Sequence, residues 1–305
     1  MSHIPVLVAE AIGYLRPERG GLFVDVTVGL GGHARAVLEA GDNVRLFGLD
    51  RDPFALAEAG RRLSDFGERV ELAMGRFGEL EEVAAKRGVE KAAGVLADLG
   101  VSSLQLDTPE RGFSFRRSGP LDMRMGTDGP TAKEVVNSYS EAELKRLFSE
   151  YGEERQAGRI ARVVAEARRT EAVETTEELS ELIYRAKGGR RHDGRVDAAT
   201  RVFQALRIEV NRELEELKSL LDQAVHLLDQ DGRLVVISYH SLEDRIVKNS
   251  LRTLARGKID EVTGRPWSET RLIEVLTRKP IRPGDEEVAL NPRARSARLR
   301  AARRI

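Results

Sequence analysis

Short apolar segments alternate with helical patterns over the first hundred residues of the chain. The four strand candidates are residues 22–24, 45–49, 70–74 and 94–97. Asp52 and Pro53 supply an N-cap and a first-turn proline for a helix that we expect to end near Leu63. Strands that alternate with helices predict an α/β fold with a mostly parallel sheet covered on both faces.

This alternation stops after Leu106, and little strand signal returns before Arg207. Three Ser/Thr-x-x-Glu capping boxes predict helix starts in the intervening stretch. Their outer residues are Thr131 and Glu134, Ser140 and Glu143, and Thr175 and Glu178. A helical domain at residues 107–207 is therefore expected to interrupt a discontinuous domain of residues 1–106 and 208–305.

The sheet pattern resumes after a long amphipathic helix. Its apolar stripe consists of Leu214, Leu217, Leu220, Leu221, Val225 and Leu228. We expect this helix to stop at Asp231 and Gly232 and a strand to follow at residues 234–237. Residues 271–277 and 297–301 alternate apolar and polar side chains, which predicts two closing strands.

The composition excludes several classes of protein. Lys+Arg and Asp+Glu both number 50, which excludes a uniformly basic nucleic-acid binder. Cysteine is absent and no histidine pair has a zinc-binding spacing, so we expect no metal. No apolar run approaches the roughly 20 residues that span a bilayer, and the start lacks the basic segment of a signal peptide. We expect a cytoplasmic protein without membrane contacts.

A glycine-rich loop follows the first predicted strand. It begins after Asp25, contains Gly29 and Gly31, and leads into a helix. Asp50 ends the next strand roughly 20 residues later, where a carboxylate can accept hydrogen bonds from ribose hydroxyls. The spacing also satisfies a dinucleotide pattern, so a nicotinamide-dependent oxidoreductase stays open. Asp25 favours S-adenosylmethionine instead, because a carboxylate beside the loop repels a diphosphate and attracts an ammonium group.

A second cluster of polar residues follows the fourth and fifth strands of the predicted sheet. Asp98 and Ser102 follow one strand, and His240 follows the other. The carboxyl ends of parallel strands meet at one edge, so we expect these three candidate catalytic residues to meet the glycine loop there. Glu243 and Asp244 are interpreted as first-turn acids of the next helix.

The sequence resembles the ribosomal RNA small-subunit methyltransferase H family, the MraW-type cytosine-N4 methyltransferases, over nearly its whole length. Several ordered motifs carry the resemblance. They include Asp25-x-Thr27-x-Gly29-x-Gly31-Gly32-His33, Asp98-Leu99-Gly100-Val101-Ser102-Ser103-x-Gln105, Tyr151-Gly152-Glu153-Glu154-Arg155, His240-Ser241-Leu242-Glu243-Asp244-Arg245 and Asn291-Pro292-Arg293-x-Arg295-Ser296-Ala297. Three departures are Asp197-Ala198, where the family usually has His-Pro, Ala34, where serine is frequent, and Tyr239, where phenylalanine is frequent.

The resemblance implies a class I methyltransferase domain, Rossmann-like, with an inserted helical domain for RNA recognition. It implies S-adenosylmethionine-dependent methylation of the N4 atom of a cytidine in the decoding region of 16S rRNA, within the small ribosomal subunit. The implied cofactor contacts, with Asp25 and Gly29 added from the loop, are Gly31, Gly32, His33, Asp50, Phe77, Asp98 and Gln105. Phe77 is expected either to flank the adenine ring or to pack in the core.

Alignment of the methyl group with the amine is the main task in such a reaction. We expect Asp98 to accept a hydrogen bond from the amino group, with Ser102 and His240 as further candidates. Tyr239 is interpreted either as a stacking platform for a flipped base or as a core residue.

RNA binding requires positive charge, and two arginine-rich segments of the insert offer it. The candidate phosphate contacts are Arg111, Arg116, Arg117, Arg124, Lys187, Arg190, Arg191 and Arg195. A non-catalytic RNA-binding ribosome assembly factor is a further alternative. A homodimer is compatible with the sequence, which does not determine the oligomeric state.

Overall fold

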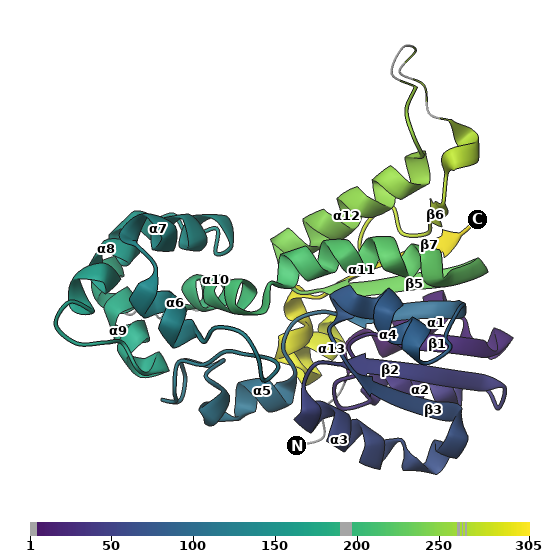
Figure 1. Ribbon diagram of the computed structural model, residues 1–305, viewed down its shortest axis with the longest axis horizontal. Helices are drawn as coiled ribbons and strands as arrows, with labels where there is room; N and C mark the ends of the chain where they lie inside the picture. The colour runs from purple at the N-terminus through teal and green to yellow at the C-terminus, as the bar shows by residue number, and fades with distance from the viewer. Residues whose placement is uncertain (1–4, 190–196, 261–262, 264, 266) are drawn as a thin grey trace. The chain divides into compact units, whose positions relative to one another are not determined.

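The computed structural model describes residues 5–189, 197–260, 263, 265 and 267–305 (Figure 1). The chain divides into two compact units. The sheet unit comprises Met1–Gly100 and Leu214–Ile305, and the helical unit comprises Val101–Glu213. Each unit has its own hydrophobic core.

The sheet unit contains a seven-stranded sheet with the order β3-β2-β1-β4-β5-β7-β6. The strands are β1 (Gly21–Asp25), β2 (Val44–Asp50), β3 (Val70–Met74), β4 (Ala92–Asp98), β5 (Leu228–Ser238), β6 (Ile273–Val275) and β7 (Arg298–Arg304). The first five in the spatial order pair in parallel, and β7 runs antiparallel to both β5 and β6. The predicted α/β fold with a mostly parallel, Rossmann-like sheet is confirmed.

Helices cover both faces of this sheet. They are α1 (Val8–Leu15), α2 (Gly32–Glu39), α3 (Pro53–Arg62), α4 (Leu80–Lys86), α11 (Glu213–Leu227), α12 (Ser241–Arg256) and α13 (Asp285–Leu290). Successive strand residues point to opposite faces, so Phe23 packs with α1 and α2 while Val24 packs with α4, α11 and α12. Burial on both faces explains the apolar runs at residues 22–24, 46–49, 94–97 and 234–237 of these parallel strands.

Asp52 begins α3 as predicted, and its carboxylate accepts the N–H of Phe54 at 3.0 Å. The helix stop expected at Asp231 and Gly232 is wrong, because α11 ends at Leu227 and β5 already begins at Leu228. Asp231 has a φ of 65°, and the β4–β5 register shifts beside it. The pair forms an irregularity inside the strand rather than a helix terminus.

The helical unit contains α5 (Ser103–Asp107), α6 (Ala132–Ser138), α7 (Glu141–Glu150), α8 (Ala157–Ala167), α9 (Thr176–Lys187) and α10 (Thr200–Asn211). The three predicted capping boxes are confirmed at the starts of α6, α7 and α9. Leu144, Leu147 and Phe148 recur at helical spacing along α7 and are buried in the core of the helical unit. Among the described residues, no helix combines the length and apolar character needed to cross a membrane.

One buried ion pair fastens α12 to β7. The Arg300 guanidinium donates from Nε to Asp244 Oδ1 at 2.6 Å, and Arg300 is only 6% exposed. Removing the carboxylate would leave a buried charge without its partner. We therefore expect Asp244→Ala to lower the free energy of unfolding by about 3 kcal/mol in urea titrations.

Glu274→Ala is the matched control. Glu274 on β6 pairs with Arg303, which lies on β7 like Arg300 but is at the surface. The cost of this substitution should stay below about 1 kcal/mol. Equal losses in the two variants would show that the Asp244 pair has no special role.

Candidate active site

Three neighbouring parallel strands each end in an aspartate. Asp25 is the last residue of β1, Asp50 of β2 and Asp98 of β4. Because β1 lies between β2 and β4 and all three run in parallel, their carboxyl ends share one edge of the sheet. Asp98 thus ends at the edge where we expected it to meet the glycine loop, and Asp25 and Asp50 end at the same edge.

The glycine loop is fastened to the end of β2. Gly29 N–H donates to Asp50 Oδ2 at 2.8 Å, and Asp52 N–H donates to Asp50 Oδ1 at 2.9 Å. Burial raises the pKa of Asp50, and these backbone hydrogen bonds act in the opposite direction. Each carboxylate oxygen keeps a further lone pair, so Asp50 can accept hydrogen bonds from a ligand's hydroxyl groups.

Glycine is needed at two positions at the start of α2, for different structural reasons. Gly31 has a φ of 80°, in the left-handed region that glycine favours. Gly32 has no such constraint, but a Cβ there would lie 2.6 Å from Pro5 Cγ. The need for glycine at position 32 therefore comes from packing against Pro5.

Thr27 connects the ends of β1 and β4. Its Oγ1 accepts the N–H of Asp98 at 2.6 Å, and its own N–H donates to Asp25 Oδ1 at 3.1 Å. Asp25 is 2% exposed, and this burial raises its pKa to about 7. His33 opposes that increase, whereas the nearby Asp98 and Asp50 carboxylates add to it.

Asp98 lies beside two side chains that are far apart in the sequence. Tyr239 Oη donates to Asp98 Oδ1 at 2.8 Å, and His33 Nδ1 lies 3.6 Å from Asp98 Oδ2. The other ring nitrogen of His33 lies 2.8 Å from the carbonyl oxygen of Val6. Burial is the largest influence on the pKa of Asp98 and raises it, while His33 and the Tyr239 hydroxyl lower it.

His240 occupies the N-cap of α12. Its Nδ1 accepts the N–H of Glu243 at 3.4 Å, and its Nε2 lies 3.2 Å from Glu243 Oε1. Glu243 Oε2 in turn accepts the N–H of Tyr239 at 2.8 Å. The interpretation of Glu243 as a capping acid is confirmed. This geometry gives His240 a structural role at the helix start, and a catalytic role stays a prediction.

Phe77 follows β3 and begins a short 3-10 helix, Phe77–Glu79. Its half-buried ring packs against the core cluster that includes α4 and α11. The neighbouring Gly78 carbonyl accepts hydrogen bonds from Ser219 Oγ and Gln223 Nε2 on α11. Core packing therefore accounts for part of the Phe77 surface, and contact with an adenine ring stays a prediction.

Ser102 and Gln105 belong to the helical unit and cap α5. Ser102 Oγ accepts the N–H of Gln105 at 3.2 Å, and Gln105 Oε1 accepts the N–H of Ser102 at 3.0 Å. Gln105 is buried. These bonds orient both side chains within the unit, and their catalytic and cofactor roles stay predictions.

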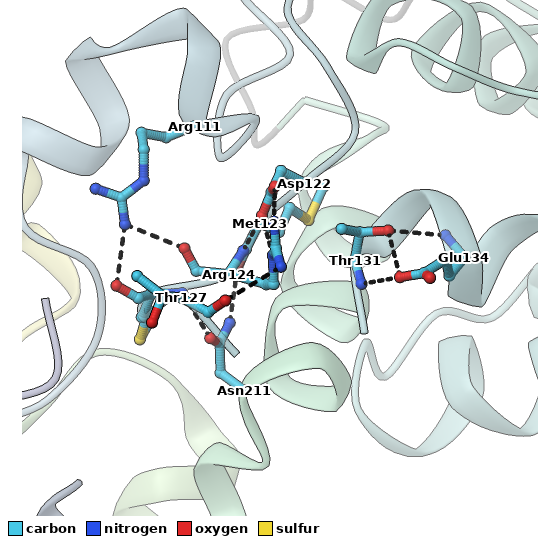
Figure 2. Close-up of polar contacts among 9 residues, drawn as sticks. Arg111, Asp122, Met123, Arg124, Thr127, Thr131, Glu134 and Asn211 are labelled. Carbon is cyan, nitrogen blue, oxygen red and sulfur yellow. Dashed lines mark hydrogen bonds and ion pairs between the residues drawn. The ribbon is translucent and has the colours of Figure 1, made fainter. Parts of the chain in front are cut away.

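Figure 2 shows that two of the candidate RNA-binding arginines stabilise a loop of the helical unit. Arg111 Nη2 donates to the carbonyl oxygens of Arg124 and Met125 at 3.1 and 3.0 Å. Arg124 forms a two-pronged pair with Asp122, at 2.9 and 2.7 Å. Asn211 closes the loop by accepting the N–H of Met125 and donating to the Met123 carbonyl. Arg111 and Arg124 are thus committed to intramolecular contacts.

The other cationic candidates fall into three groups. Lys187 donates to Glu154 Oε2 at 2.8 Å and also to the Ala198 carbonyl. Arg116 and Arg117 are exposed, and their guanidinium groups make no hydrogen bond to other described residues. The remaining three, Arg190, Arg191 and Arg195, lie outside the described residues.

Three contacts of this site were missed by the sequence analysis. They are the Thr27 link to Asp98, the Tyr239 hydroxyl on Asp98, and the Val6 carbonyl on His33. A signal for two of them was present, since Thr27 lies within the glycine motif and Tyr239 departs from the usual phenylalanine. The Val6 carbonyl is a backbone group and leaves no signal in a sequence.

The chain is similar to known proteins over its whole length. Residues 1–305 match the MraW methylase family. Ribosomal RNA small subunit methyltransferase H from Syntrophotalea carbinolica is 50% identical over 309 residues, covering 100% of this chain and 98% of that protein. The protein of the same name from Geotalea uraniireducens is 48% identical over 307 residues, covering 99% and 98% respectively. The similarity therefore includes both units.

The raised pKa of Asp25 makes the stability of the fold depend on pH. The folded protein holds a proton on this carboxyl up to about pH 7, whereas the ordinary value is 3.8. Between these values the free energy of unfolding falls as pH rises, by up to about 1.4 kcal/mol per pH unit. Asp25→Asn removes this cost, so its stability relative to wild type should increase between about pH 4 and pH 8.

Urea unfolding of both proteins across this range measures the difference. We expect the relative gain to reach roughly 2–4 kcal/mol above pH 7. A difference that is independent of pH would mean that Asp25 does not titrate in this range.

Proposed function

Because the chain belongs to the MraW methylase family, we propose that it transfers a methyl group from S-adenosylmethionine to small-subunit ribosomal RNA. The proposed acceptor is the N4 atom of a cytidine in the decoding region of 16S rRNA. The observation that carries this proposal is the match to small subunit methyltransferases H over the full length of the chain. The acidic edge of the sheet supports the choice of methyl donor.

The residues at this edge fit S-adenosylmethionine. Asp50 offers acceptors to the two ribose hydroxyls, while Asp25 and Asp98 are buried carboxyl groups close by, whose raised pKa values a cationic ligand would lower. Buried carboxylates of this kind are stabilised by a cationic ligand, and the methyl donor carries an ammonium and a sulfonium group. When bound, it supplies a strongly electrophilic methyl group.

The same charges argue against a nicotinamide dinucleotide. Its diphosphate would lie close to Asp25, with Asp98 nearby, and an anion there would repel the ionised carboxylates and raise their pKa values further. A non-catalytic assembly factor would not require three buried acids at the strand ends, because unpaired burial of carboxylates costs stability.

Asp98 is the proposed partner of the reacting amine. An ionised Asp98 would accept a hydrogen bond from the amino group and stabilise the positive charge that develops on the nitrogen. The Tyr239 hydroxyl and His33 favour this ionised form, whereas burial opposes it. The protein's own contribution is therefore to orient the amine and to hold a negative charge beside it.

RNA contact is proposed for the exposed cations of the helical unit. Arg116 and Arg117 are exposed, whereas Arg111, Arg124 and Lys187 are engaged within the unit. We therefore retain Arg116 and Arg117 as the described candidates for phosphate contact. We also retain the sequence-based candidates Arg190, Arg191 and Arg195, which lie outside the described residues.

The activity can be tested with purified protein, radiolabelled S-adenosylmethionine and small ribosomal subunits from a strain that lacks the modification. We expect label in 16S rRNA and N4-methylcytidine by mass spectrometry. Asp98→Ala should reduce the turnover by at least about 100-fold, because the acceptor of the amino hydrogen bond is lost.

The same preparations distinguish the alternatives. A rise in melting temperature with NADH but not with S-adenosylmethionine would favour an oxidoreductase. Binding to small subunits without methyl transfer would favour an assembly factor. Near-normal turnover of the Asp98→Ala protein would remove Asp98 from the proposed site.

RNA contact is tested by replacing Arg116 and Arg117 together with alanine. We expect the affinity for small-subunit RNA to fall about tenfold and the dependence of log K on log salt to weaken by about 2, one for each lost phosphate contact. Arg61→Ala with Arg62→Ala is the control for the loss of two positive charges, because these adjacent arginines are exposed on α3, where both pair with Glu58. Equal losses in both double variants would indicate a non-specific charge effect.

A further inference from the structure

Each oxygen of the Asp98 carboxyl group has one polar side chain beside it. Oδ1 accepts the Tyr239 hydroxyl at 2.8 Å, and Oδ2 faces His33 Nδ1 at 3.6 Å. Its side chain is 19% exposed, and that of His33 is 7% exposed. A carboxyl group in this setting has few orientations, so the two contacts decide where its remaining lone pairs point.

The contact of His33 with Val6 indicates which ring nitrogen of His33 carries a hydrogen. The Val6 carbonyl can only accept, so the ring nitrogen that lies 2.8 Å from it carries a hydrogen. A neutral His33 would then present the lone pair of Nδ1 to Asp98. At 3.6 Å, Nδ1 lies beyond hydrogen-bond distance of Asp98 Oδ2, so a neutral His33 donates no hydrogen bond to this carboxyl group. The hydroxyl of Tyr239 is thus the one neutral donor to Asp98 among the described side chains.

We infer that Tyr239 is a positioning residue for methyl transfer, whose hydroxyl orients the Asp98 carboxyl group and favours its ionised form. This inference rests on the proposed function, because it gives Asp98 its role toward the amine. Tyr239 acts through Asp98 and is not itself assigned to the reacting atoms.

The Tyr239 ring is held in place independently of its hydroxyl. It packs against the core cluster on the α1–α2 face of the sheet, and its N–H donates to Glu243 at 2.8 Å. Gly100, with a φ of 100°, lies beside the ring. Phenylalanine fits the same packing, so Tyr239→Phe removes the hydrogen bond without opening a cavity.

Several charged groups face this contact from neighbouring elements. His33 on α2 favours the ionised form of Asp98, whereas Glu243 on α12 opposes it. Asp25 at the end of β1 interacts with Asp98 as a like charge, and Glu287 on α13 acts on Tyr239. Burial raises the pKa of Asp98 above its ordinary value, and the hydrogen bond from Tyr239 lowers it. Losing the hydroxyl must therefore move that pKa further upward.

The test is the pH dependence of Asp98 in wild type and in Tyr239→Phe. Titration of ¹³C-labelled aspartate carboxyl groups by NMR in the free protein reports its midpoint, with Asp98→Asn used to assign the signal. We expect the midpoint to rise by about one pH unit, the size of a hydrogen bond to a charged group. The acidic limbs of S-adenosylmethionine affinity and of turnover should move in the same direction.

Two variants show whether the effect passes through Asp98. Tyr184→Phe removes a hydroxyl that donates to Asp197 at 3.0 Å in the helical unit, and it should leave the pH profile unchanged. In an Asp98→Asn background, Tyr239→Phe should no longer shift either limb. A shift that persists in this background would overturn the inference.

The outcomes separate this inference from the proposed function. An unchanged Asp98 midpoint in Tyr239→Phe, with a wild-type protein that binds S-adenosylmethionine and methylates RNA, refutes the role of Tyr239 alone. Failure of the wild-type protein to bind S-adenosylmethionine or to transfer the methyl group refutes the proposed function, whereas the NMR midpoint still reports on the Tyr239 contact.

Discussion

The burial of three carboxyl groups at one edge of a parallel sheet is the constraint on which the rest of this structure depends. Because β1, β2 and β4 are neighbours and parallel, Asp25, Asp50 and Asp98 share that edge. Repulsion and desolvation would oppose this arrangement without compensation. Backbone N–H groups compensate Asp50, Thr27 connects the strand ends, and His33 offsets negative charge. A cationic methyl donor is the natural complement of such an edge.

The helical unit shows how a chain with equal numbers of acidic and basic residues uses its arginines. Arg111 and Arg124 stabilise a loop that has little regular secondary structure, and Asn211 completes its hydrogen bonds. Backbone carbonyls in such a loop need donors, because burying them unpaired is costly. An arginine in such a cluster can therefore stabilise a loop or bind phosphate. Only the contacts in the structure distinguish these two roles.

Local signals predicted the fold well wherever the physical cause was local. The strand at residues 70–74 and the helix cap at Asp52 follow from short apolar runs and from side chains that bond nearby backbone groups. The stop expected at Asp231 failed because the same residue types that end a helix also form an irregularity within a strand. Pairing with β4 decides between the two, and that pairing is not encoded locally.

The sequence alone indicated which acids follow the apolar strand segments, because such segments are local patterns. The order of the strands, which brings these acids to one stretch of the sheet edge, was decided by the tertiary structure. The sequence did not determine what each acid contacts. Tyr239 and Asp98 are separated by 141 positions, yet their side chains are hydrogen-bonded. Gly32 is expected to contact the cofactor, and only the structure shows that a Cβ there would also collide with Pro5. Such partners are decided only when the tertiary structure brings distant segments together, since distance and orientation in space have no counterpart in sequence spacing.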